Sequence, residues 1–264
     1  MAESLTGKVV LITGASSGIG AAFARFLAER RAHVLMTARR EDRLEELAGN
    51  IRAAGGKADY WARDISAAGE REDLLRKVKA DVGSVDILIN NAGFGWYGYY
   101  HAMSWEDAAR MLAVNVEAAA HLTRLLLPGM LAKKSGHVIN ISSIAGGLPN
   151  QGIAIYSASK AFLDAFSTSL YRELRGSGVT VSAMRLGPVQ TEFYEQAKGL
   201  ENGGAVPAEQ FAIPVARVNR ALWNLLRRPR RVMYVPGWLS VSRLLEPLFG
   251  NLIDPLGPLL LRRK

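Results

Sequence analysis

The chain has no cysteine and only four histidines among its 264 residues. Because the chain has no thiol group, it cannot form disulfides, use a thiol in catalysis or bind a metal through cysteine. The histidines do not have metal-ligand spacing, so we expect packed or solvated side chains and no bound metal. Residues 1–4 are polar and precede the first apolar run, which is not the pattern of a signal peptide and predicts a cytoplasmic protein.

The excess of positive charge is concentrated at one end. Residues 211–264 contain ten Lys and Arg against two Asp and Glu, which is +8 of the net charge of +9. The basicity is therefore a property of the C-terminal part rather than of the whole chain. The chain has no nucleic-acid recognition motif or stacking pattern, so we expect no nucleic-acid partner.

Short apolar runs alternate with amphipathic stretches. We expect strands at 8–13, 33–38, 57–62, 85–90, 136–142, 179–185 and 231–235, and helices at 18–31, 41–54, 67–82, 104–133, 154–176 and 210–228. This alternation predicts a single-domain α/β fold of the Rossmann type, a doubly wound parallel sheet in the order 3-2-1-4-5-6-7 with helices on both faces. Ligands should bind beyond the carboxyl ends of the strands. We expect the catalytic domain to span 1–237, with 238–264 packed on it as an extension.

A glycine-rich turn follows the first predicted strand and leads into a helix. Gly14 permits a tight turn, Gly18 lets the backbone approach a pyrophosphate, and Gly20 lets the helix pack on the strand. The helix N-terminus offers free N–H groups to phosphates. We therefore predict a dinucleotide site here. Its other members are Ser16, Ser17 and Ile19.

The end of the second predicted strand indicates which dinucleotide binds. An acidic residue there would bind both adenosine ribose hydroxyls, but this chain has Ala38 followed by Arg39 and Arg40. Two guanidinium groups suit a 2′-phosphate. We expect NADP(H) as cofactor, with Arg39 as the main contact and Arg40 as the second; the alternative is that both arginines are solvated.

Tyr156 and Lys160 lie four residues apart, and Ser143 lies thirteen residues before the tyrosine. The i,i+4 spacing places the phenol and the ammonium on one helix face. A nearby cation lowers the pKa of a phenol, which is ordinarily near ~10, so Tyr156 could exchange a proton with a carbonyl or an alcohol. Ser143, or less favourably Ser142, could hold the same oxygen.

Together these motifs resemble the short-chain dehydrogenase/reductase family over about residues 5–237. The matching positions are Thr13-Gly14-x-x-x-Gly18-x-Gly20, Asp64, Asn90-Asn91-Ala92-Gly93, Asn115, Ser143, Tyr156-x-x-x-Lys160 and Gly187-Pro188-Val189-x-Thr191. The resemblance implies hydride transfer between a nicotinamide cofactor and a carbonyl or secondary alcohol. Tyr156 would be general acid or base, with Lys160 lowering its pKa and binding the ribose. Ser143 would polarise the carbonyl, and Asn115 would hold a water beside Lys160.

The resemblance also implies the remaining cofactor contacts. Asp64 and Ile65 would border the adenine, and the backbone of Asn91, Ala92 and Gly93 the ribose. Pro188, Val189 and Thr191 would lie at the carboxamide. The family usually has Pro-Gly where this chain has Leu186-Gly187, so we expect a retained turn and an altered nicotinamide wall.

Apolar residues follow several strand ends and predict a broad substrate pocket for a bulky hydrophobic ketone or alcohol, with reduction favoured. The expected lining is Phe94, Trp96, Leu148, Ile153 and Phe193, with Tyr97, Tyr99, Tyr100, Pro149 and Tyr194 nearby in sequence. Residues 192–209 would form a mobile loop over the substrate, or an ordinary connection. A homodimer or homotetramer is expected from the family.

The C-terminal extension is apolar, and basic clusters flank it. Such a segment can rest on an anionic membrane surface; alternatively it covers the pocket or a neighbouring subunit. Charged residues and prolines interrupt it too often for a membrane span. A catalytically idle dinucleotide sensor that docks through this tail is the alternative function.

Overall fold

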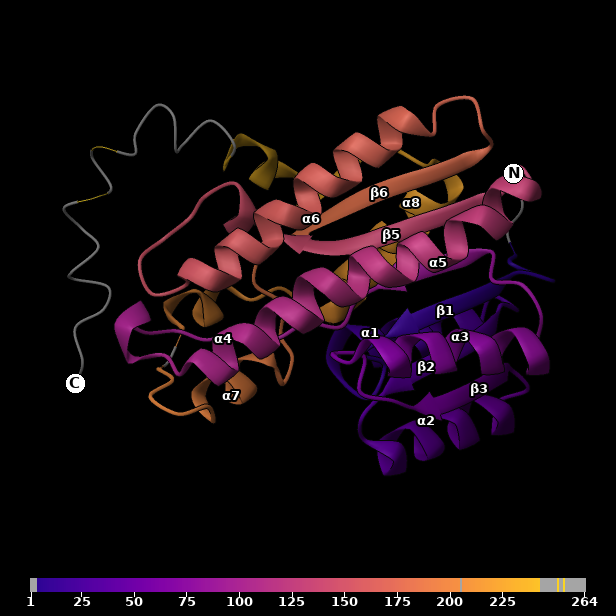
Figure 1. Ribbon diagram of the computed structural model, residues 1–264, viewed down its shortest axis with the longest axis horizontal. Helices are drawn as coiled ribbons and strands as arrows, with labels where there is room; N and C mark the ends of the chain where they lie inside the picture. The colour runs from indigo at the N-terminus through magenta and orange to yellow at the C-terminus, as the bar shows by residue number, and fades with distance from the viewer. Residues whose placement is uncertain (1–3, 205, 243–250, 252–253, 255–264) are drawn as a thin grey trace.

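The computed structural model describes residues 4–204, 206–242, 251 and 254. Within them, parallel strands form one sheet in the order β3-β2-β1-β4-β5-β6-β7, which confirms the predicted topology (Figure 1). The strands are β1 Val9–Thr13, β2 His33–Ala38, β3 Lys57–Ala62, β4 Ile87–Asn90, β5 Gly136–Ser143, β6 Val179–Leu186 and β7 Val232–Val235. The apolar strands β1 and β4 lie in the middle of the sheet, as expected of strands buried on both faces.

Helices cover both faces of this sheet. The α-helices are α1 Gly18–Ala28, α2 Glu41–Ala53, α3 Ala68–Asp81, α4 Trp105–Leu112, α5 Ala118–Ala132, α6 Ala154–Glu173, α7 Phe193–Lys198 and α8 Val215–Arg227. Val10 and Ile12 of β1 pack in one buried cluster with α1, α2 and α8. Leu11 packs in a second cluster with α3 and α5. The core therefore has two layers, because alternate side chains of a strand point to opposite faces.

One long predicted helix is irregular in its middle. Between α4 and α5 lies a π-helical segment, η2, at Ala113–Glu117. A π-turn inserts one extra residue into a helix and is frequent at functional sites. Residues 104–133 are thus not one regular α-helix, and the irregular turn contains Asn115.

The connection between β6 and α8 has more structure than the predicted loop. It contains α7 and a 3-10 helix, η4, at Pro207–Phe211. The helix predicted from residue 210 begins only at Val215, because Pro214 restricts the residue before it to extended backbone. Ile213 accordingly forms a parallel bridge with Val189. Movement of this segment remains a prediction.

Most of the predicted C-terminal extension, 238–264, lies outside the described residues. Its described start forms the 3-10 helix η5, Gly237–Val241, in which Leu239 is buried and Trp238 is exposed. The boundary at 237 and the membrane or subunit contact of the tail remain predictions. Across residues 4–204 and 206–242, none of the helices has the length and apolarity of a membrane span.

Candidate active site

A cavity of about 560 Å³ lies at the carboxyl ends of the strands. Its volume is in the usual range for small-molecule sites. Every predicted cofactor and substrate position lines it except Gly20, and among the predicted catalytic residues only Asn115 does not. The structure therefore gathers one site from nearly all the positions that the sequence indicates.

The β1–α1 turn is shaped for close backbone approach. Gly14 has φ +65, and a Cβ there would lie 2.7 Å from the Ala92 Cα. A Cβ on Gly20 would lie 2.4 Å from the Gly14 carbonyl oxygen, so this glycine lets α1 pack on the turn. Gly18 has φ +54, and α1 begins there without a side-chain cap. This cradle, which side chains would fill, fits a pyrophosphate at a helix N-terminus.

Arginines surround the adjoining end of the cavity. Arg39 and Arg40 line it, as expected, and so does Arg63, which the sequence analysis missed. The Arg40 guanidinium donates to the Ser17 hydroxyl at 2.6 Å and to the Ser16 hydroxyl at 3.2 Å. The signal for Arg63 was its place directly after β3, because β2 and β3 pair in parallel and end side by side.

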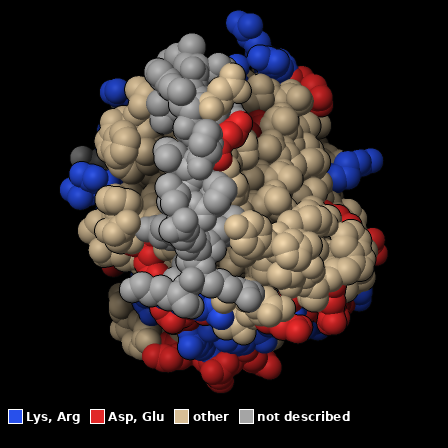
Figure 2. Space-filling view, turned by 90° about the vertical axis from the view of Figure 1, so that its left-hand side faces the viewer, with Lys and Arg blue, Asp and Glu red and all other residues tan. Residues whose placement is uncertain are grey.

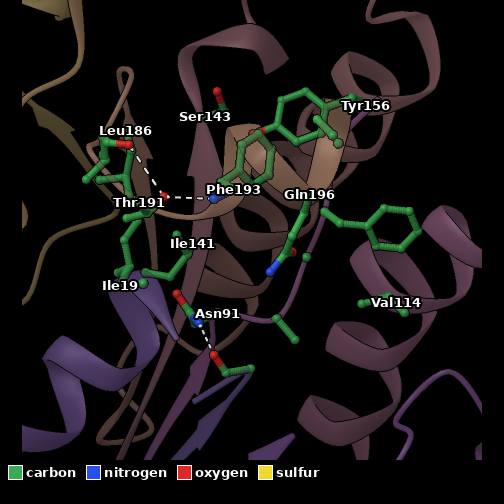
Figure 3. A pocket seen from close by; sticks show the side chains of 18 of the residues that line it. Ile19, Asn91, Val114, Ile141, Ser143, Tyr156, Leu186, Thr191, Phe193 and Gln196 are labelled. Atoms are coloured by element: carbon green, nitrogen blue, oxygen red, sulfur yellow. Dashed lines mark hydrogen bonds between the residues drawn. The ribbon is translucent and has the colours of Figure 1, made fainter. Parts of the chain in front are cut away.

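The proposed acid–base residues lie where β5 and α6 meet. Tyr156 and Lys160 are one turn apart on α6, and Ser143 is the last residue of β5. Figure 3 shows Ser143, Tyr156 and Phe193 on the same side of the cavity. The Ser142 hydroxyl also lines the cavity but donates to the Lys160 carbonyl oxygen at 3.2 Å, and the choice of Ser143 as the substrate-binding serine remains a prediction.

The protonation of Tyr156 differs from the expectation. Burial raises the pKa of Tyr156 to about 12, a hydrogen bond with Ser143 opposes this, and Tyr194 adds to it. The Lys160 ammonium is 5.7 Å from the phenol ring centroid and donates to the Ile141 carbonyl oxygen at 2.9 Å. The predicted net lowering of the Tyr156 pKa is therefore wrong for this structure, because loss of water around the phenol outweighs any stabilisation of its charged form by Lys160.

Lys160 is itself strongly affected by its surroundings. Burial lowers the pKa of its ammonium to about 8, and the carboxylate of Asp164, one turn further along α6, opposes the shift. At neutral pH the lysine is still mostly charged. The site thus holds a neutral phenol and a cationic amine side by side.

Asn115 does not line the cavity but is hydrogen-bonded to Phe94, which does. Its side-chain oxygen accepts from the Phe94 N–H at 3.1 Å, and its amide donates to the Phe94 carbonyl oxygen at 3.0 Å and to the Ser159 hydroxyl at 3.1 Å. Asn115 therefore fixes the backbone after β4 and joins it to α6. The role of this residue in holding a water beside Lys160 remains a prediction.

The substrate end is walled by apolar side chains. The Phe193 ring lies 5.7 Å from the Tyr156 ring, and the Trp96 indole donates to the Glu201 carbonyl oxygen at 3.0 Å. Tyr194 also lines the cavity, whereas Tyr97, Tyr99, Tyr100 and Pro149 do not. Lining residues that the sequence analysis missed include Arg110, Val114, Asn150 and Gln196.

The segment that departs from the family pattern is held by backbone hydrogen bonds to neighbouring segments, and the retained turn remains a prediction. Leu186 ends β6 and lines the cavity, and the Gly187 N–H donates to the Val235 carbonyl oxygen at 2.9 Å. The Ile213 N–H donates to the Pro188 carbonyl oxygen at 2.9 Å. Backbone bonds on both sides therefore hold this wall.

Within the described part of the chain, no group of three or more His, Asp or Glu side chains could hold a metal ion.

Comparisons with known proteins agree with this geometry. A family model described as short chain dehydrogenase matches residues 8–201. A "Fatty acyl-CoA reductase" of Acinetobacter baylyi is 34% identical over 259 residues, 97% of this chain and 85% of that protein. Because the match covers 97% of this chain, it includes most of the predicted C-terminal extension as well as the predicted catalytic domain.

Two solved structures are similar over nearly the whole chain. A short-chain dehydrogenase from Sphingobium yanoikuyae in complex with NADPH has a TM-score of 0.81 at 28% identity, covering 94% of this chain and 95% of that one. A short chain dehydrogenase/reductase from Burkholderia phymatum in complex with NAD has a TM-score of 0.84 at 27% identity, covering 96% and 97%. Of these two similar structures, one therefore contains NADPH and the other NAD.

Proposed function

Because this chain belongs to the short-chain dehydrogenase family, oxidoreductases that use a nicotinamide dinucleotide on C=O and CH–OH groups, we propose that it prefers NADP(H) and reduces bulky apolar ketones. The observation that carries the proposal is one cavity with guanidinium groups at one end and a half-buried phenol among apolar side chains at the other.

The cofactor preference is supported by charge. Arg39, Arg40 and Arg63 line the end of the cavity next to Ala38, where an NAD-binding site would have an acidic residue. Charged hydrogen bonds from guanidinium to phosphate oxygens are among the strong ones in proteins. Arg63 is partly neutralised, since its guanidinium donates to the Asp73 carboxylate at 2.6 Å. We therefore assign the 2′-phosphate to Arg39 and Arg40.

Each catalytic side chain has a separate task in this proposal. The bound cofactor supplies the hydride. The Tyr156 phenol, protonated because burial raises its pKa, donates a proton to the carbonyl oxygen. The Ser143 hydroxyl holds the same oxygen and stabilises the charge that develops there. The Lys160 ammonium stabilises the phenolate that remains after the proton has left.

The direction follows from the same protonation. A phenol with a pKa of about 12 is a weak acid, but at neutral pH it is almost entirely protonated, so the form present is the one that can donate a proton and little phenolate is present to act as a base. Reduction of a ketone needs a proton donor, whereas oxidation of an alcohol needs a base. The arrangement therefore favours reduction.

The substrate class follows from the wall of the cavity. Phe94, Trp96, Leu148, Ile153 and Phe193 supply apolar surface, and polar side chains such as Arg110, Asn150 and Gln196 are fewer. Burial of apolar area would drive binding, at about 25 cal/mol per Å². We propose an acyl, aryl or polycyclic ketone as substrate.

Exposed apolar side chains on α5 and α6 support a homo-oligomer. Leu125 and Leu131 are exposed on α5, and Phe162, also exposed, stacks on Phe166 at 5.5 Å between ring centroids. These are the helices through which family members associate. We propose a homodimer or homotetramer through them; light scattering coupled to gel filtration checks this, and a monomeric mass contradicts it.

The proposed reaction is tested with purified full-length chain and a panel of ketones. The panel contains an aryl ketone, a decalone and a 3-oxoacyl thioester, each with NADPH and with NADH, followed by absorbance of the reduced cofactor. We expect turnover of at least one apolar ketone, with kcat/KM at least about tenfold higher for NADPH, the effect of one charged hydrogen bond. Equal values for both cofactors contradict the preference, and no turnover with either contradicts the reaction.

A further inference from the structure

The cofactor end and the substrate end of the cavity are joined by an ion-pair cluster formed by Glu192, Arg40 and Arg43. Glu192 lies at the N-terminal boundary of α7, and the arginines lie at the start of α2. The Arg43 guanidinium donates to the two carboxylate oxygens of Glu192 at 2.9 and 2.8 Å, and that of Arg40 donates to one of them at 3.4 Å. These hydrogen bonds hold the pKa of Glu192 below its usual value, with the Arg43 bond as the largest cause.

Arg40 is shared between two parts of the site. Its Nε and Nη2 point to the hydroxyls of Ser16 and Ser17 in the phosphate turn, and its Nη1 points to Glu192. A guanidinium has a fixed number of donors in a rigid fork. The Nη1 bond therefore competes with any other anion that uses this side of the group.

Glu192 is equally tied to the substrate end. Its carbonyl oxygen accepts from the Gln196 N–H at 3.0 Å, which closes the first turn of α7. The next residue is Phe193, whose ring lies 5.7 Å from that of Tyr156 (Figure 3). The ion pairs at residue 192 thus fix the backbone from which Phe193 reaches the catalytic tyrosine.

The Arg43–Glu192 ion pair is partly exposed to solvent, with side-chain exposures of 41% and 49%. Figure 2, which shows the left-hand side of the view in Figure 1, has further blue and red groups along its lower edge. Surface ion pairs in such a setting are solvated and individually weak. The expected effects of a single substitution are therefore modest, and they need matched controls.

We propose that Glu192 is a specificity and positioning residue that anchors α7 to α2 through Arg43 and, through Arg40, weakens the binding of a 2′-phosphate. A carboxylate beside the same guanidinium repels the phosphate dianion and occupies one of the donors that would hold it. NADH, which has no such phosphate, is unaffected. The inference rests on the proposed NADP(H) preference. It adds that Glu192 reduces this preference and, through the same ion pairs, keeps the α7 wall of the substrate end ordered.

The test compares Glu192→Gln with Arg43→Gln in the full chain. Dissociation constants for NADPH and NADH are measured by quenching of tryptophan fluorescence, and order in α7 by hydrogen–deuterium exchange of a peptide covering 191–199. For Glu192→Gln we expect NADPH to bind about two- to fivefold more tightly, NADH to bind as before, and exchange in the peptide to rise. Arg43→Gln should raise exchange equally but should not tighten NADPH binding, because the carboxylate remains and turns to Arg40.

Glu195→Gln is the matched control. Glu195 lies on the same short helix, pairs with Lys198 at 2.9 Å and does not line the cavity, so the same change of charge should leave both cofactors unaffected. Unchanged or weaker NADPH binding in Glu192→Gln overturns the inference, as does equal tightening in Glu195→Gln. Failure of the proposed function is distinguishable, because it appears in the unaltered protein as equal affinity for NADPH and NADH.

Discussion

The two ends of the cavity differ in which atoms form them: mainly backbone at one end and mainly side chains at the other. The end with the glycine turn is largely backbone, held by glycines at which a Cβ would meet another backbone atom at 2.4 to 2.7 Å. The end around Phe193 is largely side chain, supplied by the connections after β4, β5 and β6. A backbone cradle accepts one shape and tolerates little change, whereas a side-chain wall can be altered residue by residue. We therefore expect substitutions to separate cofactor binding from substrate binding.

The largest effect should come from the group between the two ends. Tyr156→Phe removes the proton donor and should lower turnover by about 10²- to 10⁴-fold, while the dissociation constant for NADPH changes little. Stopped-flow reduction and fluorescence titration measure the two quantities. Tyr99→Phe makes the same change in a half-exposed tyrosine outside the cavity and should have no effect. Turnover of Tyr156→Phe within a few-fold of the unaltered enzyme would refute the assignment.

Substitutions at the arginine end should act on the cofactor alone. Arg39→Ala and Arg40→Ala each remove a proposed charged hydrogen bond to the 2′-phosphate, so NADPH should bind about 10- to 100-fold more weakly, and the binding of NADH should be unchanged. Arg25→Ala, an exposed arginine of α1 that does not line the cavity, is the control. If both cofactors weaken equally, the arginines support the fold rather than read the phosphate.

The pH dependence should also distinguish the two ends. Lys160 is charged below its pKa of about 8 and neutral above it, so its stabilisation of the phenolate is present at low pH and lost as pH rises. We expect kcat/KM for reduction to level off below pH 8 and to fall up to about tenfold per unit above it, whereas NADPH binding, which depends on arginines, stays constant. A rate that is constant up to pH 10 contradicts this role of Lys160.

The smallest effect should come from the apolar wall. Phe193→Ala removes part of a half-buried ring, so KM for an apolar ketone should rise about fivefold, the equivalent of about 1 kcal/mol of lost burial, with NADPH binding unchanged. Phe211→Ala removes a ring that is 72% exposed and outside the cavity, and serves as control. Equal changes in both variants would show that Phe193 does not contact the substrate.

The sequence was informative where function depends on neighbours along the chain. The glycine turn, the Tyr156–Lys160 pair on one helix turn and Arg39–Arg40 after β2 are each local patterns, and all of these residues except Gly20 line the cavity. Sheet order was predictable because strands alternating with helices admit few topologies. The π-helical turn at Ala113–Glu117 was not predictable, since its residues have no distinguishing composition.

Other features of the site depend on contacts between residues that are far apart in the sequence. Arg63 lines the cavity because β3 ends beside β2, and Glu192 meets Arg40 and Arg43 across about 150 residues of chain. The direction of the Tyr156 pKa shift was wrongly predicted because spacing indicates which charge is near but not how much water is excluded. The burial of a side chain depends on all the elements that pack around it.

The sequence by itself determined the order of the strands, the glycine-rich turn and the candidates for the reacting side chains, because each depends on contacts within a few residues or on strict geometric rules. Only the tertiary structure decided the protonation of Tyr156 and Lys160, the apolar wall around them and the ion pairs that join α7 to α2. Solvent exclusion and long-range charge pairing arise when separate elements pack together, so no local pattern contains them.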